Sequence, residues 1–175
     1  YLDTVTFGAW RKEIFDEVGI FDTQLKRNQD DEFHYRLNQH GLKVYQNPEI
    51  RLYYYPRNSW KGLFRQYFQY GLYKPLVLKK VSSGLQLRHL IPSGFTLYLA
   101  GLMVLFLLGF IFPLPASILG ALLPLLLYLA LCVGFTVKTS ASIKSKCIMP
   151  LLYPTVHLAY GSGFLLGLFK KPKAK

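Results

Sequence analysis

The second part of this 175-residue chain has no acidic residue, because all nine Asp and Glu side chains lie before residue 50. Residues 1–49 carry six Lys or Arg beside these nine acids, a net charge of −3. Residues 50–175 carry the other fifteen Lys or Arg, a net charge of +15. Charge divided so unevenly predicts two physically different regions joined in one chain.

Cysteine is also scarce. Cys132 and Cys147 have none of the spacings typical of metal-binding cysteines, and Cys132 lies in an apolar run, where we expect it to pack as a small hydrophobic side chain. Two such residues predict no disulfide framework and indicate no redox compartment.

No Asp, Glu, Lys or Arg occurs between Arg88 and Lys138. This apolar run is too long for one membrane span and divides at FPLP (112–115), which predicts two hydrophobic helices, 92–112 and 114–137, each near the ~20 residues that cross a bilayer. The Lys and Arg residues flank the apolar runs. That arrangement is typical of a membrane protein and does not favour nucleic acid as a partner.

A third apolar stretch, 147–169, has two interpretations. Its length permits a membrane span, but a span would export the basic tail 170–175 and so conflict with the positive-inside tendency. A re-entrant or interface helix avoids that conflict. Just before the membrane region, residues 59–73 combine aromatic and basic side chains at helical spacing, which favours an amphipathic helix in the headgroup layer over a soluble core helix.

The first region predicts short helices and strands. Gly19 and Gly41 are expected to end helices at 11–19 and 30–40. Short strands are predicted at 2–7, 43–47 and 50–55. We expect an α/β arrangement here, and the start at Tyr1 favours a chain cut inside a domain. The domain boundaries expected are 1–58, 59–91 for the interface helix and basic linker, 92–169 for the membrane helices, and 170–175.

A third of the acids form one tripeptide, Asp30, Asp31 and Glu32. Their simplest role is electrostatic stabilisation of a helix N-terminus. A metal site through Asp30 and His34, one helical turn apart, lacks further visible ligands. The third interpretation is a general base, since adjacent carboxylates repel each other's charge and so favour a proton acceptor. Glu32 and Arg36 are also spaced to form an i,i+4 ion pair.

The run FGAWRKEIFDEVGIFDTQLKRNQDDEFHYRL resembles the acceptor-side half of the catalytic domain of membrane-bound, GT-A family 2 glycosyltransferases similar to those of succinoglycan biosynthesis. The resemblance implies a partial GT-A domain of the α/β class, followed by an interface helix and two to three hydrophobic membrane helices. It assigns the catalytic base to Asp30 with Glu32 as the second acid, and leaves Asp31 as the alternative base.

Downstream, the family's Gln-x-x-Arg-Trp motif corresponds to Gln66-Tyr67-Phe68-Gln69-Tyr70, in which Gln69 replaces the arginine. The resemblance implies a substrate-binding role for these positions, and Arg65 is the candidate to compensate for the lost guanidinium. Trp10 is a candidate for stacking on a sugar ring, although core packing is its simpler role. The candidate substrate-binding residues are therefore Trp10, Arg65, Gln66, Gln69 and Tyr70.

The resemblance further implies an inverting transfer of a sugar from a nucleotide-sugar to a lipid-linked or polysaccharide acceptor. Family members hold the diphosphate through Mg²⁺ or Mn²⁺ on an Asp-x-Asp motif. This chain has no Asp-x-Asp, so we assign it no metal ligand and expect it to be the C-terminal part of an enzyme, inactive alone. The expected location is the plasma membrane of a bacterium or archaeon, in contact with membrane lipids, with the catalytic part cytosolic. The alternative is a small non-catalytic integral membrane protein, either a transporter subunit or an interaction module.

Overall fold

A computed structural model describes residues 1–2, 4–5, 7–81, 85–112 and 116–171. The helices in this part of the chain are α1 (Lys12–Val18), α2 (Gln29–Gln39), α3 (Trp60–Lys80), α4 (Leu87–Leu108), the 3-10 helix η1 (Ala116–Leu122), α5 (Leu123–Lys138) and α6 (Ile143–Leu168). The hairpin turn predicted at FPLP and most of the basic tail lie outside the described residues.

The two short helices predicted in the first region are confirmed as α1 and α2. Gly19 ends α1 with a φ of 86°, a left-handed conformation that favours glycine, and its N–H bonds to the carbonyl of Phe15. Both helices turn their apolar faces onto one core. That core contains aromatic and aliphatic side chains from both helices and from the segments around them: Val18, Phe33, Leu37 and Val44, with Val5, Trp10, Ile14, Phe15, Phe21 and Leu42 packed against them.

The predicted α/β GT-A domain is wrong for this chain, because the described residues form no β-strand. The N–H of Leu2 donates to the carbonyl of Val44 at 2.9 Å, and this isolated antiparallel bridge is the one strand-like pairing within the described part. Strand-forming residues need a neighbouring ladder, and a lone two-stranded pairing is at best marginally stable in water. Residues 50–55, predicted as a strand, run as an exposed segment without regular structure. Residues 3 and 6 of the first predicted strand lie outside the described residues.

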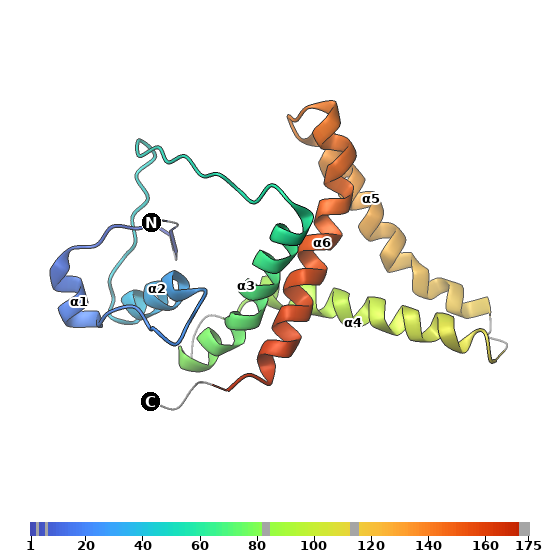
Figure 1. Cartoon of the computed structure of the whole chain (residues 1–175), viewed down its shortest axis with the longest axis horizontal. Helices are drawn as coiled ribbons and strands as arrows, with labels where there is room; N and C mark the ends of the chain where they lie inside the picture. The colour runs from blue at the N-terminus through green and yellow to red at the C-terminus, as the bar shows by residue number, and fades with distance from the viewer. Residues whose placement is uncertain (3, 6, 82–84, 113–115, 172–175) are drawn as a thin grey trace.

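The amphipathic helix predicted at 59–73 is confirmed as α3, but it continues to Lys80. The hydroxyl of Ser59 caps its N-terminus by accepting from the N–H of Gly62 at 3.2 Å. Pro75 lies inside the helix, where it removes one backbone hydrogen bond, yet α3 does not end there. In Figure 1 the helix lies between α2 on one side and α6 on the other.

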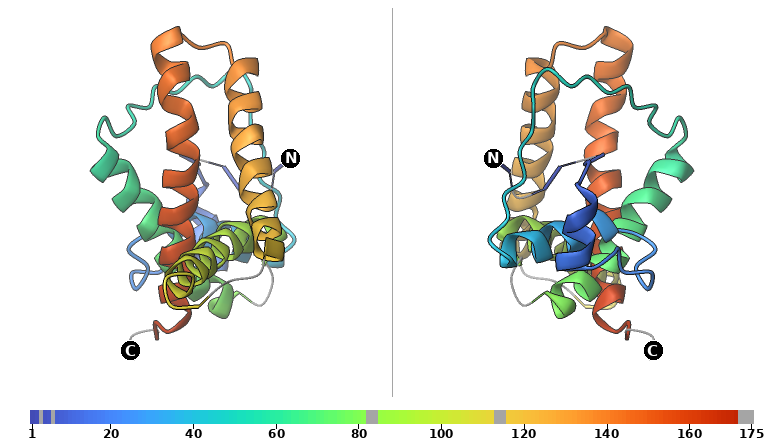
Figure 2. Two further views of the ribbon diagram at one scale, coloured as in Figure 1. Left: turned by 90° about the vertical axis from the view of Figure 1, so that its right-hand side faces the viewer. Right: turned by 90° about the vertical axis from the view of Figure 1, so that its left-hand side faces the viewer.

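Helices α3 and α6 pack along each other through glycine (Figures 1 and 2). A Cβ atom on Gly71 of α3 would overlap the carbonyl oxygen of Tyr160, and one on Gly163 of α6 would overlap that of Phe68. Gly161 faces the backbone of Pro92 in α4 in the same way. The absence of side chains at these positions lets the backbones approach closely, as small residues do between membrane helices.

Two helical stretches are long and apolar enough to cross a membrane, Leu87–Leu108 and Leu119–Lys138. They correspond to the predicted hydrophobic helices, and most of their large side chains are exposed on the folded chain, among them Phe106 and Phe135. An apolar surface of this extent is typical of contact with lipid. The third apolar stretch is helical as α6, which packs against α3, α4 and α5.

Candidate functional site

The three adjacent carboxylates of α2 point in three different directions, because each residue of an α-helix is rotated by ~100° from the one before it. Glu32 is buried, Asp31 is half-buried and Asp30 is exposed. Their surroundings therefore differ although they are consecutive in the chain, and each is described in turn.

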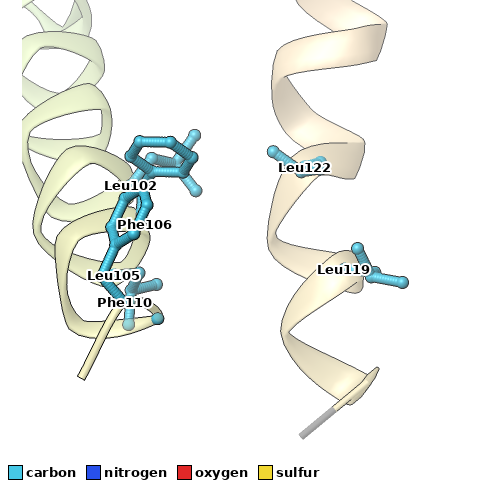
Figure 3. Close-up of a pocket in the computed structure, with 7 residues that line it drawn as sticks. Leu102, Leu105, Phe106, Phe110, Leu119 and Leu122 are labelled. Carbon is cyan, nitrogen blue, oxygen red and sulfur yellow. The ribbon is translucent and has the colours of Figure 1, made fainter. Parts of the chain in front are cut away.

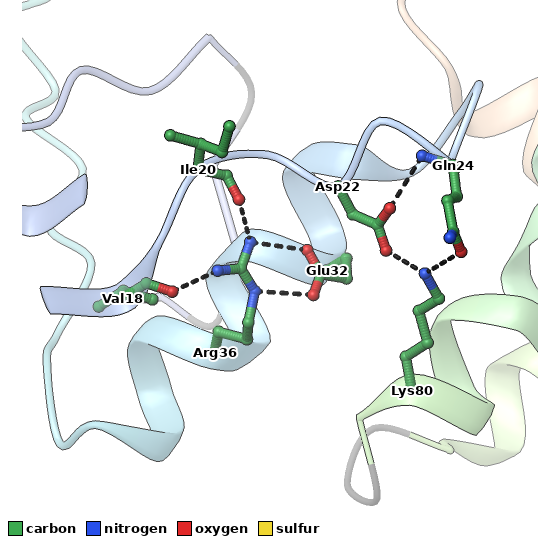
Figure 4. A network of polar contacts seen from close by, with 7 residues as sticks. All are labelled: Val18, Ile20, Asp22, Gln24, Glu32, Arg36 and Lys80. Atoms are coloured by element: carbon green, nitrogen blue, oxygen red, sulfur yellow. Dashed lines mark hydrogen bonds and ion pairs between the residues drawn. The ribbon is translucent and has the colours of Figure 1, made fainter. Parts of the chain in front are cut away.

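Glu32 forms the predicted ion pair with Arg36, which is confirmed. Its two carboxylate oxygens accept from Nε and Nη2 of the guanidinium at 2.7 and 3.0 Å. The same guanidinium donates to the carbonyl oxygens of Val18 and Ile20, just beyond α1 (Figure 4). With only 5% of its surface exposed, Glu32 ties α2 to the end of α1 and is closed to a substrate.

Asp31 is held by a cation from α3. Its Oδ2 accepts a hydrogen bond from Nζ of Lys74 at 2.9 Å, and this lysine also donates to the hydroxyl of Tyr35 at 3.3 Å. Lys74 is 5% exposed, whereas the Asp31 side chain is 31% exposed, so the buried partner of this ion pair is the lysine. This contact joins α2 to α3 across 43 positions of the sequence.

Asp30 opens onto a cleft of about 1340 Å³. No hydrogen bond or ion pair to Asp30 is found among the described residues. The cleft is formed by the segment before α1, the start of α2, the first half of α3 and the irregular chain that joins them. Its lining includes Trp10, Arg11, Asp30, Gln66, Tyr67 and Tyr70. A carboxylate in such a cleft is positioned to accept a proton from a bound hydroxyl group.

The structure brings three of the five candidate substrate-binding residues to this cleft. Gln66 donates from Nε2 to the hydroxyls of Tyr70 at 2.9 Å and Tyr54 at 3.4 Å. Trp10 lies at the edge of the aromatic core, with its ring centroid 5.2 Å from that of Phe33, and it also lines the cleft.

The other two candidates lie elsewhere. Gln69 accepts from Nε of Arg27 at 3.0 Å and does not line the cleft. Arg65 is exposed and also lies outside the cleft lining, so the geometry gives no support to compensation for the missing guanidinium at Gln69.

Sequence reasoning missed two contacts that position the acidic tripeptide. Asn28 precedes α2 in a left-handed conformation (φ 61°) and donates from Nδ2 to the carbonyl of Tyr70 at 2.9 Å. Lys74 makes the other. A signal for it existed, because Tyr73, Leu76 and Val77 around it form a buried apolar stripe. A lone lysine on such a stripe indicates a buried carboxylate partner.

His34 lies one helical turn beyond Asp30 and is completely buried. Neither ring nitrogen has a hydrogen-bond partner within the described part of the chain, and the ring centroid lies 5.6 Å from that of Trp10. Burial lowers the pKa of His34 below its usual value of 6.5, and the negative charges of Asp30 and Asp31 oppose this shift only in part. The imidazole is therefore neutral at neutral pH.

A second polar contact connects α3 to the loop before α2. Lys80 forms an ion pair with Asp22 and also donates to Oε1 of Gln24 at 2.9 Å (Figure 4). Burial opposes ionisation of Asp22, but the hydrogen bonds from Lys80 and from the N–H of Gln24 outweigh it and hold the pKa below its usual 3.8. Together with Asn28 and Lys74, this contact fixes the acidic helix against α3.

The described residues do not fit a metal site, because no three His, Cys, Asp or Glu side chains among them come close enough to hold an ion. A separate cavity of about 390 Å³ lies between the end of α4 and the η1–α5 junction. Figure 3 shows that Leu102, Phe106, Leu119 and other apolar side chains line it. It lacks groups for chemistry. We therefore identify the cleft at Asp30 as the candidate active site.

Two curated proteins are similar to the chain over most of its length. It is 30% identical over 171 residues to a dolichyl N-acetyl-alpha-D-glucosaminyl phosphate 3-beta-D-2,3-diacetamido-2,3-dideoxy-beta-D-glucuronosyltransferase of Methanococcus voltae, covering 97% of this chain and 48% of that protein. It is 28% identical over 156 residues to the succinoglycan biosynthesis protein ExoA of Rhizobium meliloti (strain 1021), covering 88% of this chain and 44% of that protein.

These similarities confirm the resemblance to glycosyltransferases that was inferred from the acidic tripeptide and its surroundings. The chain spans about half the length of the curated relatives it matches. No family model and no solved structure matches it.

Proposed function

We propose that residues 1–175 form part of an inverting, membrane-bound family 2 glycosyltransferase that transfers a sugar from a nucleotide-sugar to a lipid-linked or polysaccharide acceptor. The observation that carries this proposal is the separation of the three carboxylates. Lys74 holds Asp31, Arg36 holds Glu32, and only Asp30 faces the cleft without a partner among the described residues. The similarity to a glucuronosyltransferase supports the reaction class.

In the proposed reaction Asp30 is the general base. Its carboxylate accepts the proton of an acceptor hydroxyl while the hydroxyl oxygen forms a bond to the anomeric carbon of the donor sugar. The bond from that carbon to the nucleoside diphosphate breaks on the opposite face, and the diphosphate leaves with the electron pair. Attack from the face opposite the leaving group inverts the anomeric configuration.

Other residues of the cleft position the acceptor. Gln66 and Tyr70 present an amide and a hydroxyl that can bond to sugar hydroxyls, and Trp10 offers an apolar ring in the same cleft. An acceptor at the membrane is supported by the packing of α3, which supplies this wall of the cleft and contacts α6, which in turn packs on the apolar helices. We propose that the enzyme lies in the plasma membrane with this cleft on the cytosolic side, where nucleotide-sugars are available.

The donor site is not assigned to any residue described above. The divalent cation that the resemblance implies, Mg²⁺ or Mn²⁺, stays a prediction for residues outside this chain, and no step of the proposal passes through it. We accordingly expect residues 1–175 expressed alone to transfer no sugar.

The proposal is tested with membranes that contain the full natural protein carrying residues 1–175. Radiolabelled nucleotide-sugars are supplied singly, and label is measured in the lipid extract and in polysaccharide. We expect one donor to label one of these fractions, with NMR showing an anomeric configuration opposite to that of the donor. Retained configuration would contradict the single displacement, and no labelling with any nucleotide-sugar would contradict the proposed function.

A further inference from the structure

Lys74 is an unusual lysine, because its charged end is buried at the junction between the acidic region and the apolar helices. Only 5% of the residue is exposed. Its ammonium group has two side-chain oxygens within reach, Oδ2 of Asp31 at 2.9 Å and the hydroxyl of Tyr35 at 3.3 Å, and lies 5.2 Å from the centre of the Tyr35 ring. Burying the charge of a lysine costs free energy unless a carboxylate pairs with it. The burial of Lys74 therefore needs an explanation other than keeping the protein soluble.

The backbone that carries Lys74 is held firmly. One turn earlier, Gly71 lies directly against the carbonyl of Tyr160, and the adjacent Pro75 contacts the position of Gly167 in α6. The neighbouring Tyr73 and Val77 belong to a buried cluster that also includes Leu25 and Tyr35. Since close-packed elements transmit position accurately, the ammonium group is fixed relative to α6 and therefore relative to the apolar helices.

The partner of Lys74 is adjacent in sequence to the residue proposed as base. Two neighbouring carboxylates at a helix start are both proton acceptors, and both could compete for one acceptor hydroxyl. A cation placed on one of them removes this competition and leaves the other free for the cleft. Arg36 does the same for Glu32.

We infer that Lys74 is a positioning residue: it binds Asp31, turns it away from the cleft, and leaves Asp30 as the one carboxylate of the tripeptide that meets the acceptor. This inference rests on the proposed function for the role of Asp30, while the contact between Lys74 and Asp31 stands on the geometry alone. Lys74 also connects the acidic helix to the part of α3 that packs on α6.

The test compares Lys74→Met with Lys61→Met in the full natural protein in membranes. Lys61 is an exposed lysine on the first turn of the same helix and serves as the matched control. Carboxylates are labelled with a water-soluble carbodiimide and an amine, and the modified peptides are quantified by mass spectrometry. We expect Asp30 to be labelled and Asp31 protected in the wild-type and Lys61→Met proteins. Labelling of Asp31 is expected to rise to the level of Asp30 in Lys74→Met.

Sugar transfer supplies the second readout. We expect Lys74→Met to lower kcat about tenfold, the size typical of an interaction between contacting charges, with the donor KM unchanged. The double variant Lys74→Met with Asp31→Asn removes both charges, and we expect its kcat to return to within about threefold of the wild type. Rescue by Asp31→Asn would show that the loss of activity in Lys74→Met comes from the unpaired carboxylate of Asp31.

The outcomes separate the two proposals. Unchanged protection of Asp31 in Lys74→Met overturns the inference, as does a double variant no more active than Lys74→Met alone. If the wild-type protein transfers no sugar, the proposed function fails, and the labelling of Asp31 still decides whether Lys74 holds it. If Lys74→Met does not fold, the labelling of Asp30 and the kcat are measured in the double variant instead. That variant leaves no buried charge without a partner.

Discussion

The contacts that stabilise the acidic region differ in kind from those that stabilise the packing of the apolar helices. Around α1 and α2, aromatic rings pack on one another and buried charges pair, as in Glu32 with Arg36. Between α3, α4 and α6 the contacts are made by bare backbone at Gly71, Gly161 and Gly163. The acid-free composition of the second region explains the difference, because without carboxylates its lysines cannot pair internally and close packing must replace ion pairs.

This comparison also explains where the candidate site lies. The cleft forms where the two kinds of contact meet, with Asp30 from the first region and Gln66 and Tyr70 from α3. Polar side chains of α3 reach across to the acidic region on one face, while its glycine contacts α6 on another. Helix α3 thus places a water-accessible carboxylate at a fixed position beside an apolar surface suited to lipid.

Breaking the Glu32–Arg36 pair is expected to give the largest loss of stability. Glu32→Gln keeps the side-chain shape but leaves the guanidinium without its anion, which should lower the free energy of unfolding by about 3 kcal/mol. Glu17→Gln is the control, since Glu17 is 55% exposed and 3.9 Å from His40, and its loss should cost less than about 1 kcal/mol. Denaturant titration in detergent measures both. Equal effects would show that ion pairing does not hold the first region together.

Filling a glycine contact should cost somewhat less. Gly163→Ala places a Cβ atom against the carbonyl of Phe68, and the resulting separation of α3 from α6 should cost about 2 kcal/mol. At Gly134 a Cβ atom would meet nothing within 4 Å, so Gly134→Ala should be neutral or stabilising by up to about 1 kcal/mol through helix propensity. Thermal unfolding in the same detergent compares them. A Gly163→Ala protein as stable as Gly134→Ala would contradict close packing as the cohesive contact.

The smallest effect is expected at His34 and has the opposite sign. His34→Leu removes a buried imidazole without hydrogen-bond partners among the described residues, and should raise the free energy of unfolding by about 1 kcal/mol at neutral pH. Because the folded-state pKa of His34 lies below 6.5, protonation favours the unfolded chain, so the stability that neutral His34 contributes is lost as pH falls below 6.5.

The advantage of His34→Leu over the wild type should therefore widen between pH 6.5 and more acid values. The exposed His40 provides the control variant His40→Leu, whose free energy of unfolding is measured over the same pH range. A pH-independent difference for His34→Leu would contradict the lowered pKa of His34, because it would mean that the imidazole titrates alike in the folded and unfolded chain.

Local patterns predicted much of the helical structure. Apolar spacing and the stops at Gly19 and Gly41 identified α1 and α2, and the run without charged residues identified the two hydrophobic helices. The end of α3 could not be predicted, because Pro75 indicates a break and only the packing of α6 against it keeps the helix continuous. The predicted strands are wrong because Val44 forms a β-bridge with Leu2 alone. The exposed residues after it pair with no other segment within the described part.

The acidic tripeptide was recognised from sequence, but the roles of its members could not be separated there. Asp31 is held by Lys74, which lies 43 positions after it in the chain. Spacing within α2 carries no information on such a distant partner. The pair of Glu32 with Arg36 was predictable, since both residues lie on one helix at i,i+4.

The account is tested most directly by Asp30→Asn in the sugar-transfer assay with the full natural protein. Loss of a general base should lower kcat by about 10²- to 10⁴-fold, while the unfolding temperature stays that of the wild type because Asp30 is exposed and has no partner among the described residues. Asp16→Asn, at an exposed carboxylate of α1, should leave transfer unchanged. Near-normal turnover in Asp30→Asn would contradict the claim that Asp30 is the base.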